Sequence, residues 1–390
     1  MQFSNHMDAI QLSNIRAIGA KAAALAAGGR GVTKLPVGEP DFGTPKHIVD
    51  AAIASLQAGD THYAPNRGTL AFRQAIADKL WNDNQVKVDP VSEVLVMNGC
   101  AEALFCAVTG LLDPGDEMII IEPTFINYIQ LAKIANAVPV VIRAREEDKW
   151  LPDPEVIRKA ITPKTKMILL NTPTNPTGAV YPYELLKEIA DLAQKHGIFV
   201  VADEVYEKLI YGDAKHVSIA SIPGMEELGV TINGLSKAYA MTGWRLGYIA
   251  ARKELILPML KVHQYTTTCI PIFVQAGGVD AIRNSEADVE QMRQEYERRR
   301  NLISGILEEI PGVTLVRPQG TFYLYPNISA SGLKSPDFIN RLLDEEGVAT
   351  IPGTTFDSAG EANIRISFAS DEASLRRGAE KIGKLMASLR

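Results

Sequence analysis

The chain has 390 residues, of which 46% are hydrophobic and 22% charged, and its formal net charge is −6 at pH 7. At roughly 100–200 residues per domain, this length predicts two or three packed units and excludes a short peptide module, while the balanced composition excludes a disordered chain. Apart from Arg298, Arg299 and Arg300, the chain has no block of basic residues, which argues against a nucleic-acid partner.

The N-terminus and the cysteines indicate where the protein is located. Residues 1–18 lack the basic and then apolar pattern of a signal peptide, and the alanine-rich segment 20–27 is far shorter than the roughly 18 apolar residues of a membrane span. The spacings of Cys100, Cys106 and Cys269 fit neither a disulfide framework nor a CxxC metal site. We therefore expect a cytoplasmic protein with reduced thiols, no bound metal and no membrane partner.

The first part of the chain contains helical patterns but no sheet of its own. We assign residues 1–43, which end in GEPDF and the following glycine, to an N-terminal arm that completes a small domain or reaches a partner subunit. Residues 44–60 and 67–82 then follow as predicted helices. The second of these contains LAFRQAIADKLW, whose apolar residues recur at helical spacing.

Seven short apolar segments predict the strands of one sheet. Most of them are separated by helical patterns, and this alternation is typical of a parallel sheet covered by helices on both faces. We therefore predict an α/β fold in which residues 44–280 form a large domain with a mostly parallel seven-stranded sheet. Ligand sites in such sheets lie at the carboxyl ends of the strands. The segments are VLVMNG (94–99), MIIIEP (118–123), VPVVIRA (138–144), MILLNTP (167–173), IFVVADEVY (198–206), VTING (230–234) and GYIAA (247–251).

The pattern changes after residue 280. Residues 284–310 predict a long, charged, amphipathic helix. Three strand-like segments, VTLVRPQGTFYLYPNI, GVATIPG and ANIRISFA, then accompany two predicted helices at 335–346 and 371–389. We therefore predict that residues 281–390 form a smaller α+β domain.

Two predicted strand ends carry charged residues. Asp203 ends a buried strand, where desolvation should raise the pKa of its carboxyl unless a cation is near, although a lone aspartate there is more often a turn or cap residue. Lys237 follows the next strand, and in an apolar site a lysine can act as a Schiff-base nucleophile, although most such lysines are solvated. Ser236 and Arg245 beside it would provide the hydroxyl and the guanidinium of a phosphate clamp.

Three further strand ends carry weaker signals. In NTPTNPTG, prolines fix an irregular turn and leave the Asn175 amide free to donate a hydrogen bond. Cys100 and Ala101 open a predicted helix, whose first backbone N–H groups attract anions. Phe125 in EPTFINY could stack on a planar ring, although most aromatic residues at this kind of position belong to the core.

Together these groups match the chemistry of pyridoxal phosphate. Its aldehyde needs an amine, its pyridine nitrogen a carboxylate, its phenolic oxygen hydrogen-bond donors and its phosphate a clamp. The sequence therefore predicts this cofactor.

Six motifs then identify a family. The sequence resembles the class I aminotransferases of the fold-type-I pyridoxal-phosphate enzymes, particularly the bacterial branch that includes aspartate and aromatic aminotransferases. The resemblance implies a homodimer with shared active sites that moves an amino group from an L-amino acid to a 2-oxo acid by a ping-pong mechanism. The motifs are GEPDF (38–42), YAPNRG (63–68), NTPTNPTG (171–178), ADEVY (202–206), SKAYAMTGWRLGY (236–248) and IRISFA (364–369).

The resemblance also implies a role for each residue that binds the cofactor ring. Lys237 corresponds to the Schiff-base lysine, which also moves the proton at the substrate Cα. Asp203 would pair with the pyridinium nitrogen. Tyr206 and Asn175 would donate to the phenolic oxygen, and Phe125 would stack on the ring where many relatives have tryptophan.

The remaining implied roles concern the phosphate and the substrate. Arg245, Ser236 and the backbone amides of Cys100 and Ala101 would hold the phosphate, and Tyr63 would reach the phosphate of the neighbouring subunit. The substrate α-carboxylate would be bound by a third group of residues, namely Arg365, the Gly38 backbone N–H and Asn175.

Two departures from the family pattern bear on cofactor and substrate binding. Gly234 stands where relatives often carry serine, so one phosphate hydroxyl is expected to be missing. Ala101 and the segment 264–273 bring no cation to places where enzymes that prefer aspartate present one. We therefore expect a neutral, aromatic or otherwise large amino donor, although Arg67 or Lys34 could supply the missing charge.

Three alternatives stay open at this point. A carbon–sulfur β-lyase would use the same fold, cofactor, lysine and aspartate. A ligand sensor in a transcription regulator would need a DNA-binding module, and fewer than 40 residues precede GEPDF. The motifs could also be coincidental turns, but six would then have to occur in order by accident.

Overall fold

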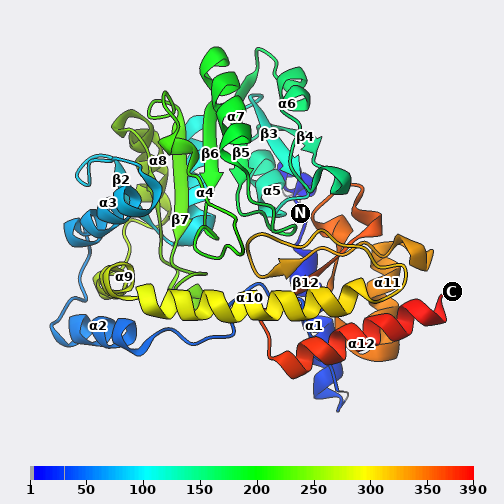
Figure 1. Ribbon diagram of the computed structural model, residues 1–390. Helices are drawn as coiled ribbons and strands as arrows, with labels where there is room; N and C mark the ends of the chain where they lie inside the picture. The colour runs from blue at the N-terminus through cyan, green and yellow to red at the C-terminus, as the bar shows by residue number, and fades with distance from the viewer. Residues whose placement is uncertain (1–3, 30) are drawn as a thin grey trace.

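The computed structural model describes residues 4–29 and 31–390, so residues 1–3 and 30 of the predicted arm lie outside the described residues (Figure 1). None of the helices in this described part combines the length and apolarity needed to cross a membrane. The elements that precede the main sheet are α1 (Asn14–Ala27), β1 (Thr33–Lys34), α2 (Lys46–Gln57) and α3 (Leu70–Asn84).

A seven-stranded sheet forms the centre of the larger unit, with the strand order β2-β8-β7-β6-β5-β3-β4. Strand β8 is antiparallel to both of its neighbours, and the other strands share one direction. The predicted mostly parallel sheet is confirmed. Its strands are β2 (Val94–Met97), β3 (Glu117–Glu122), β4 (Val138–Arg143), β5 (Thr165–Asn171), β6 (Phe199–Asp203), β7 (Gly229–Gly234) and β8 (Gly247–Ala250).

Helices cover both faces of this sheet, so most of its strands are buried and mainly apolar, although the edge strand β4 is largely exposed or half-buried and β7 contains Thr231 and Asn233. Val200 and Ala202 of β6 pack with α6 and α7 on one face, whereas Val201 packs with α4, α5 and α8 on the other. Because side chains alternate along a strand, Asp203 belongs to the same face as Val201. The helices are α4 (Gly99–Leu111), α5 (Asn127–Ile134), α6 (Pro154–Ala160), α7 (Tyr183–His196), α8 (Lys253–Thr266) and α9 (Ile272–Asn284).

A second group of elements follows in sequence and contains a three-stranded antiparallel sheet, β11-β12-β9. Figure 1 shows α10, drawn in yellow, running from α9 towards α11 and α12. The predicted helix 335–346 is an α-helix that ends in a π-helical turn over residues 342–346. The elements are α10 (Glu286–Glu308), β9 (Tyr323–Leu324), α11 (Ser335–Arg341), β10 (Val348–Ala349), β11 (Ile351–Pro352), β12 (Ile364–Ser367) and α12 (Glu372–Ser388).

The N-terminal segment is joined to this second group. Strand β1 pairs in parallel with β10, and the Leu35 N–H donates to the Ala349 carbonyl at 3.0 Å. Leu35 is buried in the core cluster that also contains Tyr206 and Tyr323. The domain boundaries given above, 1–43, 44–280 and 281–390, stay predictions.

Candidate active site

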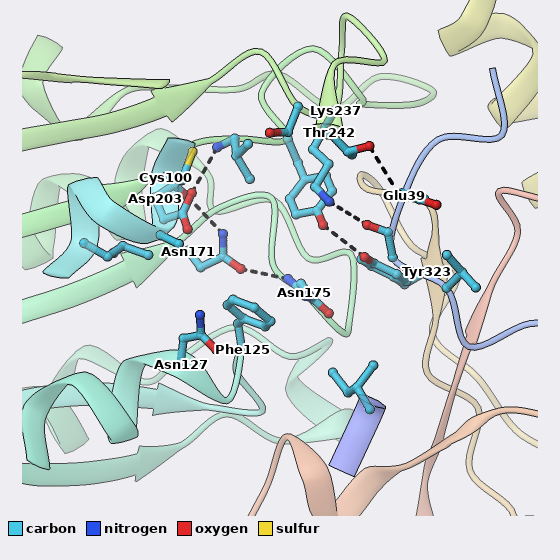
Figure 2. A pocket seen from close by; sticks show the side chains of 18 of the residues that line it. Glu39, Cys100, Phe125, Asn127, Asn171, Asn175, Asp203, Lys237, Thr242 and Tyr323 are labelled. Atoms are coloured by element: carbon cyan, nitrogen blue, oxygen red, sulfur yellow. Dashed lines mark hydrogen bonds between the residues drawn. The ribbon is translucent and has the colours of Figure 1, made fainter. Parts of the chain in front are cut away.

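A cavity of about 590 Å³ lies at the carboxyl ends of the parallel strands, facing β9 and β12 (Figure 2). It brings together residues from all along the chain, and all but one of the predicted site residues line it. The predicted residues in its lining are Gly38, Cys100, Ala101, Phe125, Asn175, Asp203, Tyr206, Ser236, Lys237, Arg245 and Arg365.

Asp203 is a buried carboxylate at the end of β6, only 4% exposed. Burial raises the pKa of its carboxyl to about 6, although hydrogen bonds from the Tyr128 hydroxyl (2.9 Å) and the Val205 N–H (3.3 Å) act in the opposite direction. The Asn171 amide donates to the Asp203 backbone carbonyl at 2.9 Å and fixes the strand end. A cationic ring nitrogen in the cavity would compensate this buried charge.

Lys237 lies in the turn after β7 and is partly buried. Its Nζ donates to the Gly38 carbonyl at 2.6 Å and lies 5.6 Å from the centre of the Tyr206 ring and 5.7 Å from that of Phe322. Figure 2 shows this lysine reaching toward the segment that contains Glu39. The amine therefore stands beside two aromatic rings.

The beginning of α4 forms an anion-binding cradle. The first backbone N–H groups of a helix are unpaired, and here they belong to Cys100 and Ala101. Arg245 lies against them, with its Nη1 donating to the Thr242 carbonyl at 3.0 Å. Gly99 has a φ of +74°, which favours glycine, and a Cβ there would lie 2.6 Å from Arg245 Nη2, so glycine leaves room for the guanidinium in this position. With Ser236 these donors suit a phosphate dianion.

The departure at Gly234 has a packing explanation. A Cβ at this position would lie 2.8 Å from Cys100 Sγ. The thiol therefore occupies the space into which a larger residue at 234 would project. Burial raises the pKa of the Cys100 thiol well above its ordinary value, and the nearby Asp203 carboxylate acts in the same direction.

Arg365 on β12 offers a site for a carboxylate. The side chain is 2% exposed, and it donates from Nη1 to Asn175 Oδ1 at 3.0 Å and from Nη2 to the Pro36 carbonyl at 2.9 Å. Its Nε is buried with no hydrogen-bond partner among the described residues. A buried guanidinium with an unused donor fits an anionic substrate group. Because Asn175 accepts through Oδ1, its amide nitrogen stays available as a donor.

The structure also adds residues that the sequence reasoning missed. Tyr128 and Asn171 hold Asp203, Tyr323 lines the cavity beside Tyr206, and Arg16 lines it from α1. The helical spacing from Phe125 to Tyr128 is a signal that could have found Tyr128, since the two rings meet edge to face at 5.9 Å. No sequence pattern points to Arg16, because it is a single exposed charge on α1, a helix far in sequence from the other residues of the cavity.

Tyr63 is the predicted residue outside this cavity. It is 88% exposed and lines a separate hollow of about 490 Å³ with Cys269 and Phe273. Lys34 and Arg67, the two residues suggested as the missing cation for an acidic substrate, also lie outside this cavity. Lys34 is exposed on β1, and Arg67 Nη1 donates to the Ser92 carbonyl at 2.9 Å.

Comparisons with known proteins agree with this geometry. The family described as aminotransferase class I and II matches residues 30–382. An aspartate aminotransferase of Pyrococcus abyssi is 40% identical over 99% of this chain and 98% of its own, and an aromatic-amino-acid aminotransferase of Thermococcus litoralis is 38% identical over the same shares. The structure of a Thermus thermophilus aspartate aminotransferase with maleate is also similar, with a TM-score of 0.95 and 39% identity over 99% of this chain and 100% of that one.

These matches extend over nearly the full length of both partners in each pair, and the cavity carries the amine, carboxylate and anion-binding groups described above. The chain therefore belongs to the class I and II aminotransferases and is a transaminase that uses pyridoxal phosphate.

Proposed function

We propose that this cavity moves an amino group from a neutral, aromatic or otherwise large L-amino acid to a 2-oxo acid, with Lys237 as the reacting amine. The observation that carries the proposal is that Lys237, Asp203 and Arg365 line one cavity although they come from three different strands or strand ends. These groups suit an amine-binding aldehyde, a ring nitrogen and a substrate carboxylate.

Each part of the cofactor would be held by a different wall of the cavity. The phosphate would bind Arg245, Ser236 and the backbone N–H groups at the start of α4. Asp203 would keep the ring nitrogen protonated, and Phe125 would stack on the ring. When bound, pyridoxal phosphate supplies an aldehyde that bonds to amines and a ring that accepts the electron pair released at the substrate Cα.

The chain's own residues would then perform the proton transfer. In the first half of the cycle Lys237 would move the proton from the substrate Cα to the cofactor carbon that bears the amino nitrogen, and in the second half it would move a proton from that carbon to the carbon of the acceptor. Phe322 and Tyr206 would exclude water around the amine, since their rings lie 5.7 and 5.6 Å from Nζ. Tyr206 and Asn175 would donate to the phenolic oxygen beside it.

Donor and acceptor would use the same carboxylate site in turn, as a ping-pong cycle requires. Arg365 would bind the α-carboxylate that both substrates share, with the Gly38 N–H as a further donor. Buried guanidinium groups give strict geometry because two parallel N–H donors must match two oxygens.

The preference for a neutral or large donor is supported by the apolar part of the lining. Ile15, Leu104, Ala101 and Val37 contribute apolar surface to the cavity. The exposed Arg16 is a cation on the same lining, from α1. Comparison of kcat/KM over aromatic, aliphatic and acidic donors tests the preference, and a far higher value for aspartate would contradict it.

The shared homodimeric site is supported by two exposed tyrosines. Tyr63 and Tyr265 are 88% and 85% exposed, which is unusual for large rings outside an interface. The Asn66 amide donates to the Thr268 carbonyl at 2.7 Å and so joins the loop that carries Tyr63 to the segment that follows α8, the helix that carries Tyr265. We expect sedimentation to give a dimer and Tyr63→Phe to weaken cofactor binding; an active monomer would contradict this part. The free cysteines support a cytoplasmic location.

The experiment that tests the reaction is a visible absorption spectrum of the enzyme loaded with pyridoxal phosphate. Amino acids are added one at a time without any 2-oxo acid. We expect the visible band to convert to the near-ultraviolet band of the amine form of the cofactor, fastest with the best donor. Release of ammonia and pyruvate from a cysteine conjugate without an acceptor would instead indicate a β-lyase.

A further inference from the structure

Tyr323 joins two parts of the cavity that the proposed function treats separately. It is the first residue of β9, is 1% exposed and pairs with Ser367 of β12, the strand that also carries Arg365. Its hydroxyl lies 3.1 Å from the Tyr206 hydroxyl, and the centre of its ring lies 4.3 Å from the Arg365 guanidinium carbon. Figure 2 shows its side chain directed into the cavity.

The hydrogen bond between the two tyrosines has a defined direction once Tyr206 is engaged. Each phenol has a single O–H group. If Tyr206 donates its proton to the cofactor's phenolic oxygen, as the proposed function requires, the Tyr206 oxygen must accept the proton of Tyr323. Such a chain of donors polarises each member, so that Tyr323 would make Tyr206 a stronger donor.

The surroundings of Tyr206 make this donation matter. The ring is 4% exposed and the charged groups that face it are Lys237, at 5.6 Å from the ring centre, together with Arg365 and Asp203. Burial raises the pKa of Tyr206 well above its ordinary value, and the neighbouring Tyr323 raises it further while Arg365 lowers it. A buried phenol with so few partners depends strongly on each hydrogen bond that it makes.

The ring of Tyr323 acts on a different partner. Its face lies against the Arg365 guanidinium, whose other side faces Phe356 at 4.6 Å. The two rings, together with Asn175 Oδ1 and the Pro36 carbonyl, which accept from Nη1 and Nη2, restrict how the guanidinium can turn. The orientation that a carboxylate needs is thus fixed before the carboxylate binds.

We propose that Tyr323 is a positioning residue with two separable actions: its hydroxyl donates to Tyr206, and its ring holds Arg365 for the substrate carboxylate. The inference rests on the proposed function, because the roles of Tyr206 and Arg365 come from it. It goes further by predicting that one side chain affects both the hydrogen bond that Tyr206 donates to the cofactor and the orientation of Arg365 for the substrate carboxylate.

The test uses holoenzyme variants that separate hydroxyl from ring. Tyr323→Phe removes only the hydroxyl, and Tyr323→Leu removes both features, with Tyr323→Met as a second aliphatic variant should the leucine variant not fold. Tyr325→Phe is the matched control: Tyr325 is 2% exposed and its hydroxyl donates to the Gly353 carbonyl at 3.3 Å, away from Tyr206.

The first readout is the pH midpoint at which the visible band of the lysine-bound cofactor changes. Donation from Tyr206 stabilises negative charge on the phenolic oxygen and so favours loss of the proton from the lysine linkage. Tyr323→Phe should therefore raise the midpoint by about half to one pH unit. Tyr325→Phe should leave it unchanged.

The second readout is the affinity for 3-phenylpropionate, a carboxylate that cannot react, measured by calorimetry. We expect Tyr323→Phe to bind it within about twofold of the unmodified enzyme and the aliphatic variants to bind it roughly 5- to 30-fold more weakly.

Two results would overturn the inference: equal midpoints for Tyr323→Phe and Tyr325→Phe, or equal carboxylate affinity for the phenylalanine and aliphatic variants. If the unmodified enzyme gave no visible band that depends on Lys237, the proposed function would fail first and this inference with it.

Discussion

The cavity has a floor and a rim that differ in how they are built. The floor consists of Asp203, Tyr206, Lys237 and Arg365, which are fully or partly buried and held by hydrogen bonds or aromatic rings. The rim is represented by Arg16, which is exposed on α1. The difference fits the proposed division of labour, in which the packed groups would act on features common to all amino acids and the exposed Arg16 would act on the variable side chain.

Burial fixes the positions of the floor residues, but it also carries a cost in folding free energy. An ionised group taken out of water destabilises the fold unless partners compensate it. Asp203 receives hydrogen bonds from Tyr128 and Val205, yet burial still raises its pKa to about 6. Arg365 keeps one buried donor, Nε, without a partner in the described part of the chain. The floor is therefore completed by its ligands.

The largest effect should come from the floor. Lys237→Ala removes the side chain that we propose as both the reacting amine and the carrier of the Cα proton, so we expect kcat to fall by more than about 10³-fold. Steady-state kinetics measures the loss, and equilibrium dialysis should still detect cofactor held at the phosphate cradle. Retained turnover would remove Lys237 from its proposed role.

The second prediction concerns Asp203 and the pH dependence of the free energy of unfolding. The pKa of Asp203 is about 6 in the folded chain and lies above its ordinary value of 3.8. Between these two pH values, the folded cofactor-free chain therefore keeps a proton on Asp203 that the unfolded chain has lost. Its free energy of unfolding should therefore fall as pH rises from about 4 to about 6, by about 3 kcal/mol. Urea unfolding of cofactor-free enzyme should show this decline, and Asp203→Asn should remove it.

The control for this titration is Asp191→Asn, an exposed carboxylate paired with Lys187 on α7. Its curve should follow that of the unmodified enzyme. Added pyridoxal phosphate should reduce the decline, because a cationic ring nitrogen compensates the Asp203 charge. Parallel curves for the unmodified and Asp203→Asn proteins would contradict the burial argument.

Arg365→Lys tests whether the floor acts on all substrates alike. A lysine keeps the charge but loses the two parallel donors, so we expect kcat/KM to fall about 10- to 100-fold for every amino acid. The same substitution at Arg341, a surface residue paired with Glu345, serves as control. A loss confined to substrates with one class of side chain would show that Arg365 recognises that side chain and not the shared α-carboxylate.

The smallest effect should come from the rim. Arg16→Gln should lower kcat/KM for aspartate and glutamate by no more than about fivefold, because exposed ion pairs contribute little. Phenylalanine and other neutral donors should be unaffected. A larger loss for acidic donors would show that the rim selects them and would weaken the proposed preference.

The same contrast explains what could be predicted from the sequence. The seven strands were predicted as short, mainly apolar segments, which burial on both faces produces in most of them. Asp203 and Lys237 could be identified because each stands where such a run ends. Tyr323 and Tyr128 were missed because a tyrosine in a buried segment has the same pattern whether it packs in the core or faces a cavity.

Elements outside the sheet were harder to predict. The predicted helix 335–346 changes to a π-helical turn at 342, a change in hydrogen bonding that apolar spacing does not encode. The contribution of α1 to the cavity depends on how the N-terminal segment folds back through the β1 and β10 pairing. That pairing joins residues distant in sequence, which no local pattern reveals.

The contact between position 234 and Cys100 also constrains how this site can change by mutation. A side chain at 234 would begin 2.8 Å from the Cys100 sulfur, so serine cannot enter first without displacing it. Replacement of Cys100 by glycine would remove this contact, whereas the Leu246 carbonyl at 3.1 Å and the Gly247 Cα at 3.3 Å would still confine a side chain at 234. The effects of substitutions at the two positions are therefore expected to be non-additive.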